Sequence, residues 1–140
     1  MPQRWNNPAA LRFAERRRRE DEAPKLCAEV PALTSLRLDL EERSGAGGTK
    51  HIRRVMVDRA PALFLVPCGD PRCVDGEHDL TPQVMQAVRS RRPSFEGSDS
   101  CPGNIGSSPC LRVLHFVGTA EYSASAATEA PVPVRARYFP

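Results

Sequence analysis

The sequence predicts a small α+β domain in which an antiparallel or mixed sheet packs against one helix. Three segments carry this prediction. Residues 35–42 alternate leucines with charged residues, residues 81–92 have the start and stop signals of a helix, and residues 111–122 form a long, largely apolar run. A hydrophobic period of two is typical of a strand with one wet face, and a period of 3.6 is typical of a helix.

The chain of 140 residues has room for one domain of ordinary size and for unstructured ends. We expect three parts: a basic N-terminal arm over residues 1–30, the α+β domain over residues 31–122, and an extended C-terminal tail rich in proline and alanine over residues 123–140. Hydrophobic residues make up 40% of the chain and charged residues 26%, which fits a globular chain in solution.

Charge is unevenly distributed along the chain, although the formal net charge is only +3. Residues 1–20 carry six arginines against two glutamates, whereas residues 69–79 hold four acids against one arginine. No run of about 18 apolar residues predicts a membrane helix. An arginine cluster stands where a secretory signal would have its apolar core. We therefore expect a cytoplasmic protein without a membrane anchor.

The N-terminal arm is expected to be helical. Asn7 can cap a helix with Pro8 in its first position, and residues 9–20 have good helix propensity. Four consecutive arginines, residues 16–19, cannot share one face of a helix, so they surround its second half. Two interpretations remain open: a solvated, fraying helix, or a segment that contacts phosphates or an acidic partner.

Three strands are expected before the first cysteine pair. Residues 35–42 form the first strand, the glycine-rich residues 44–48 form a turn, and a second strand runs from about 51 to 57, so the two should make an antiparallel hairpin. The apolar residues 63–66 form a short third strand that leads directly into Cys68.

The helix candidate over residues 81–92 has clear boundaries. Thr81 is the expected N-cap, Pro82 the first helical residue, and Pro93 ends the helix. Val84, Met85 and Val88 share one face that should pack on the sheet. The strand over residues 111–122 has apolar residues on both faces, which favours a central strand covered on both sides.

Four of the five cysteines form two pairs in turn-forming sequence: Cys68 with Cys73, and Cys101 with Cys110. Tetrahedral zinc takes four thiolate or imidazole ligands, usually as two local pairs. Cys68 follows one predicted strand and Cys110 precedes another, so the pairs would meet if those strands were antiparallel neighbours. We therefore predict a structural zinc site with these four ligands, in which His78 could replace one cysteine.

Other uses of the cysteines stay open at this stage. Two local disulfides, a redox switch or an iron–sulfur cluster would also need paired cysteines. Cys27 stands apart between apolar neighbours, which is typical of a small buried side chain. A catalytic zinc site would need an open coordination position and a nearby acid such as Glu77, which four thiolates would not leave room for.

The leading functional hypothesis is a non-enzymatic, zinc-stapled interaction module. Its arginines would contact nucleic acid, with RNA in a larger assembly favoured, because the guanidinium group pairs with phosphate and stacks on bases. One alternative is a protein–protein adaptor that docks through the arm and the tail. A second alternative is a thiol-redox or zinc-dependent enzyme; no small-molecule substrate is predicted. The arginines expected at the nucleic-acid surface are Arg16, Arg17, Arg18, Arg19, Arg53, Arg54, Arg89, Arg91 and Arg92.

Overall fold

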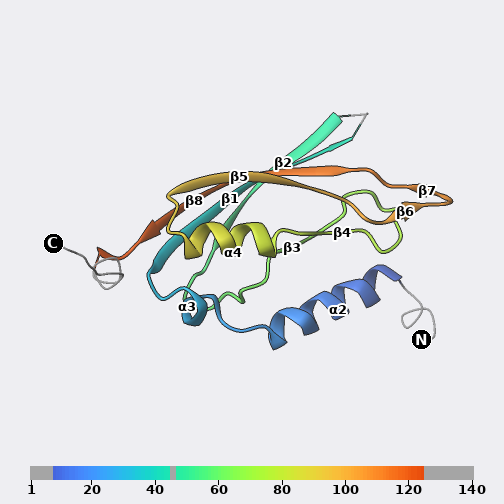
Figure 1. Ribbon diagram of the computed structural model, residues 1–140. Coiled ribbons are helices and arrows are strands. Elements are labelled where there is room, and N and C mark those ends of the chain that lie inside the picture. Colours follow the sequence, from blue (N-terminus) through green and yellow to red (C-terminus); the bar gives the residue numbers. More distant parts are fainter. Residues whose placement is uncertain (1–7, 45–46, 125–140) are drawn as a thin grey trace.

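A four-stranded antiparallel sheet forms the centre of the mixed α+β fold (Figure 1). The computed structural model describes residues 8–44 and 47–124. The predicted tail at 123–140 therefore lies almost entirely outside the described residues. The strands of the main sheet follow one another in space as β2 (Gly47–Val55), β1 (Leu33–Ser44), β8 (Val113–Tyr122) and β5 (Ser94–Ser100).

Two small antiparallel ribbons are formed by β3 (Leu65–Pro67) with β4 (Glu77–Asp79), and by β6 (Asn104–Ile105) with β7 (Ser108–Pro109). The helices are α2 (Pro8–Glu22), α3 (Leu26–Glu29) and α4 (Thr81–Arg89). The helices and the β3–β4 ribbon lie on one side of the main sheet, and the β6–β7 ribbon lies at one end of it (Figure 1). Within the described ranges, no helix is both long and apolar enough to cross a membrane.

The predicted hairpin is confirmed by the pairing of β1 with β2. Leu36, Leu38 and Leu40 of β1 are all buried, as their spacing predicts, and they lie on the face that packs into the core. Glu42 continues the same face by one more step of two residues and is also buried. The alternating charged residues of β1 are on the opposite face, so β1 fixes an apolar side and a polar side for the whole sheet.

The predicted helix is found as α4, with two corrections. Its N-cap is Leu80 rather than Thr81, whose hydroxyl oxygen instead accepts the backbone N–H of Phe64 at 2.8 Å. The helix ends at Arg89, before the expected end, and Arg91 then adopts a positive φ of 57°. Its buried residues Val84, Met85, Ala87 and Val88 belong to the core formed with the sheet.

One prediction about strands is wrong, and one pairing that was considered for the cysteines is absent from the described residues. β8 is central in the sheet but is covered on one side: Leu114 and Phe116 are buried, whereas Val117 on the other face is 45% exposed. The apolar segment before Cys68 does not pair with β8, because β3 pairs with β4. The edge strand β5 was not expected, since Phe95 is the one large apolar residue in a sequence of serine, glycine and acids.

Candidate metal centre

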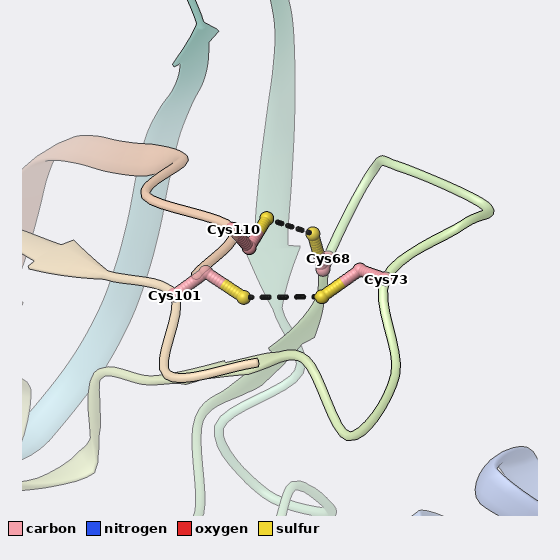
Figure 2. Close-up of side chains that lie close together, drawn as sticks. All are labelled: Cys68, Cys73, Cys101 and Cys110. Atoms are coloured by element: carbon pink, nitrogen blue, oxygen red, sulfur yellow. Dashed lines mark hydrogen bonds between the residues drawn. The ribbon is translucent and has the colours of Figure 1, made fainter. Parts of the chain in front are cut away.

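The four paired cysteines converge at one end of the sheet. The Sγ atoms of Cys68 and Cys110 are 3.6 Å apart, as are those of Cys73 and Cys101, and all four sulfurs lie within 4.8 Å of one another (Figure 2). All four are free thiols, with Cys73 and Cys101 buried and the other two half-buried. This arrangement of sulfurs could hold a metal ion.

Backbone hydrogen bonds hold the two cysteine loops against each other. The N–H of Val74 donates to the carbonyl of Asn104 at 2.7 Å, and the N–H of Asn104 donates back at 3.1 Å. The N–H of Cys110 donates to the carbonyl of Gly103 at 2.9 Å, which closes the second loop. The cysteine pairs therefore meet through direct contact between their loops, and not through the neighbouring strands that the sequence suggested.

Two glycines make room for the sulfurs. A Cβ atom on Gly76 would overlap the Sγ of Cys73 and would lie 2.8 Å from the Sγ of Cys101. A Cβ atom on Gly103 would likewise collide with Cys73 and would lie 2.6 Å from the carbonyl oxygen of Val74. Both glycines sit two or three residues after a cysteine, in Cys-Val-Asp-Gly and Cys-Pro-Gly, and this spacing is the sequence signal that could have identified them.

The acidity of the thiols differs across the cluster. Burial raises the pKa of Cys73 to about 11, and hydrogen bonding with Cys101 adds to the shift. Burial also raises the pKa of Cys68. Burial would also raise the pKa of Cys110. Hydrogen bonds to this sulfur, chiefly from the backbone N–H of Arg112, outweigh burial, so the pKa of Cys110 is lowered. A metal ion would bind the thiolate forms and would displace the protons from the buried thiols.

A buried polar cluster lies beside the cysteine loops and was not predicted. Its centre is the carboxylate of Glu42, which accepts the backbone N–H of Gly69 at 3.0 Å and the Nε–H of Arg112 at 3.0 Å. The Nε2 atom of His78 is 2.9 Å from the same carboxylate, and Nδ1 of His78 is 3.1 Å from Asp99. The alternation of β1 could have indicated Glu42, since this residue continues the row of buried leucines.

His78 and Cys27 lie outside the cysteine cluster. Each ring nitrogen of His78 faces a carboxylate, that of Glu42 or that of Asp99, and His78 is fully buried between them. The structure thus gives this histidine a place in the polar cluster and not among the grouped thiols. Cys27 is exposed, with its Sγ 3.8 Å from the carbonyl oxygen of Asp58, so the expectation of a buried side chain is wrong.

Several of the expected nucleic-acid-binding arginines form ion pairs inside the chain. Arg16 and Arg19 both contact Glu77, at 3.1 and 2.7 Å, and this ties α2 to the domain. Arg18 pairs with Glu15 and Glu22 on its own helix, and Arg89 pairs with Glu29 at 2.9 Å.

The remaining expected arginines are not brought into one cluster. Arg53 is half-buried on β2 and donates to the carbonyl of Leu65 at 3.2 Å. Arg17, Arg54 and Arg92 are exposed and belong to different elements, namely α2, β2 and the segment after α4; Arg91 is half-buried in that same segment.

Comparisons with known proteins add no relative: no family model, curated protein or solved structure matches the chain significantly.

Proposed function

We propose that Cys68, Cys73, Cys101 and Cys110 bind one zinc ion that joins the two loops as a structural staple. The convergence of the four sulfurs carries this proposal. A tetrahedral zinc ion with Zn–S bonds of about 2.3 Å places its sulfurs about 3.8 Å apart. The two shortest Sγ–Sγ distances, both 3.6 Å, are close to that value. A disulfide would instead bring two sulfurs to about 2.05 Å.

A structural role suits this site better than a catalytic one. Four thiolates would fill the coordination shell of zinc and leave no position for water or substrate. Two acids that follow the first cysteine pair are also engaged elsewhere: Glu77 pairs with Arg16 and Arg19, and the carboxylate of Asp79 accepts the backbone N–H of Thr81 at 3.0 Å. These contacts assign both acids to the fold, so the proposed activity of the module is binding.

Elemental mass spectrometry tests the metal proposal on protein purified without a tag or chelator. One zinc per chain is expected for the unaltered protein and for Cys27→Ser, because Cys27 is exposed and outside the cluster. The double variant Cys101→Ser, Cys110→Ser should lose the ion. Iron with visible absorption would identify an iron–sulfur cluster instead. Equal zinc in both variants would contradict the assignment of the ligands.

We further propose that the zinc-stapled module binds nucleic acid, with RNA favoured, mainly through phosphate contacts. Support comes from the excess of arginine in the chain and from Arg17, Arg54 and Arg92, which are exposed and form no ion pair within the described residues. The aromatic content is only 6%, so stacking on bases would be sparse and sequence preference weak.

The salt dependence of binding tests this second proposal. With three phosphate contacts, log K for a labelled single-stranded RNA should fall with log salt at a slope near −2, since each contact contributes about 0.7. Replacing Arg17, Arg54 and Arg92 by glutamine should flatten the slope, whereas Arg43→Gln should not, because Arg43 is paired with Glu41. A flat response in the unaltered protein, or a partner that stays bound after nuclease treatment, would favour a protein adaptor.

A further inference from the structure

Arg53 is a half-buried cation without an ion-pair partner among the described residues. Its guanidinium donates one hydrogen bond, to the carbonyl of Leu65 at 3.2 Å, and no carboxylate of the described residues forms an ion pair with it. Arg16 and Arg112 are also half-buried, but each faces a carboxylate, that of Glu77 and that of Glu42 respectively. Because a buried charge is expensive unless it is paired, the position of Arg53 requires a reason.

A cavity of about 320 Å³ opens beside this side chain. One part of its wall is apolar and includes Val55, Met56, Leu63 and Phe64. The volume is at the lower end of the range of small-molecule sites, which usually combine apolar walls with a few placed polar groups. The cavity can therefore take a small organic group together with a charged group that reaches Arg53.

The charged residues around the cavity are mostly basic. Arg53 and Arg59 line it together with one acid, Glu20; Arg54 also borders the cavity, but its side chain is on the opposite face of β2 from that of Arg53. Lys25 lies next to them, since its Nζ donates to the carbonyl of Arg59 at 3.2 Å. Burial lowers the pKa of the Arg53 guanidinium, and the nearby charge of Arg16 also lowers it while Glu20 opposes the shift.

Arg53 and Arg54 are on opposite faces of the sheet. Arg53 lies opposite Leu38, whose side chain is in the core, whereas Arg54 lies opposite Arg37 on the polar face. Val55 lies opposite Leu36 and so shares the core face with Arg53. Arg53 is therefore the arginine of β2 that is on the same side of the sheet as the apolar wall of the cavity.

We propose that this cavity binds the phosphate group of a small phosphorylated organic molecule, with Arg53 as the anchoring donor. The positive charges of Arg53, Arg59 and the neighbouring Lys25 exceed the single negative charge of Glu20 by two, which matches the dianionic phosphate group better than a carboxylate. The planar fork of the guanidinium can donate two parallel hydrogen bonds to phosphate oxygens. The organic part of the ligand would then lie on the apolar wall. This site is separate from the cysteine cluster, and it does not depend on zinc or on nucleic-acid binding.

Phenyl phosphate is a suitable probe because it joins a phosphate group to an apolar ring. Isothermal titration calorimetry on the full chain as purified, at low salt and without nucleic acid, should show binding in the submillimolar range. Inorganic phosphate should bind about tenfold more weakly because it lacks apolar surface. Phenol, which lacks the charge, should not bind measurably. Failure of phenyl phosphate to bind at millimolar concentration would overturn the proposal.

Two variants assign the binding to Arg53. Arg53→Met should weaken phenyl phosphate binding at least tenfold, or about 1.4 kcal/mol, because it removes charge-assisted hydrogen bonds. Arg43→Met is the matched control, since Arg43 is on the same hairpin but pairs with Glu41, and it should leave the affinity unchanged. Arg53→Met should also fold with unchanged or higher stability, as replacing an unpaired buried charge usually does. Equal affinity of Arg53→Met and the unaltered chain, or failure of this variant to fold, would contradict the proposal.

Discussion

The buried carboxylate of Glu42 accepts the backbone N–H of Gly69 at 3.0 Å, across 27 positions of the sequence. Gly69 directly follows Cys68. The same carboxylate accepts the Nε–H of Arg112, two residues after Cys110. A single side chain on the central sheet thus contacts both cysteine loops. The two loops are consequently anchored to the sheet as well as to each other, before any ion is considered.

Glu42→Ala is expected to lower the free energy of unfolding by about 3 kcal/mol, because it leaves buried partners without their acceptor. Glu41→Ala is the matched control. Glu41 lies on the opposite face of β1, where it contacts Arg43 at 2.9 Å in a partly exposed ion pair, and such pairs contribute about 0–1 kcal/mol. Urea denaturation measures both values, and equal losses would argue against an anchoring role for Glu42.

Stability should also depend on pH through Glu42. Burial alone would raise the pKa of this carboxyl, but hydrogen bonds from Arg112, Gly69 and His78 outweigh burial and lower the pKa below its ordinary value. A lowered pKa in the folded state means that the contribution is complete above the unfolded value, about 4.3, and is lost as the pH falls below it. In metal-free protein, Glu42→Gln should therefore reduce the decline of unfolding free energy between about pH 5 and pH 2. A decline as steep as that of the unaltered chain would assign the pH dependence to other carboxyls.

Gly76→Ala should impair metal binding, since its Cβ would occupy the space of the Cys73 and Cys101 sulfurs. We expect at least about a tenfold loss of zinc affinity, comparable with the loss on changing residues that position ligands. Affinity can be measured by competition with a chromogenic chelator. Gly106→Asn is the control: Gly106 has a positive φ of 62° that asparagine tolerates, and no atom lies within 4 Å of its added Cβ. Similar affinities for the two variants would show that the cluster has room to expand.

Removal of the metal should loosen the cysteine loops before the sheet. The core formed by residues such as Leu38, Val84 and Phe116 does not include the cysteines, so the far-ultraviolet circular dichroism should change little on chelation. Hydrogen exchange should accelerate at the backbone amides of Val74, Asn104 and Cys110, which hold the loops together. Unchanged protection at these amides would mean that the loops hold their structure without an ion.

Much of the fold could be predicted because it depends on local periodicity. The alternating leucines of β1 and the signals around α4 have the periods of a strand and a helix, and both elements appear where these patterns place them. β5 lacks such a pattern because Phe95 is its one large apolar residue. The ring of Phe95 packs edge-on against that of Phe116, with ring centroids 6.3 Å apart. An edge strand can be held by a single apolar contact and backbone pairing, and single-sequence patterns do not report either.

The sequence predicted which cysteines group together, but not the contacts that bring their loops together. Paired cysteines in turns indicate shared ligation, and the sulfurs of Cys68 and Cys110 do meet. The contacts that bring them together, such as that between Val74 and Asn104, join residues far apart in sequence and have no local signal. The ion pairs of Arg16 and Arg19 with Glu77 also join residues far apart in sequence. No local pattern indicates that these two arginines of the run at 16–19 are paired within the chain.

X-ray absorption at the zinc edge, on protein purified without chelator, would identify the atoms that bind the metal. We expect a coordination shell of four sulfurs at about 2.3 Å and no nitrogen or oxygen ligand. This shell should be lost in the Cys101→Ser, Cys110→Ser variant. A shell containing nitrogen or oxygen, or protein that carries no metal while its four thiols are free, would contradict the four-cysteine staple.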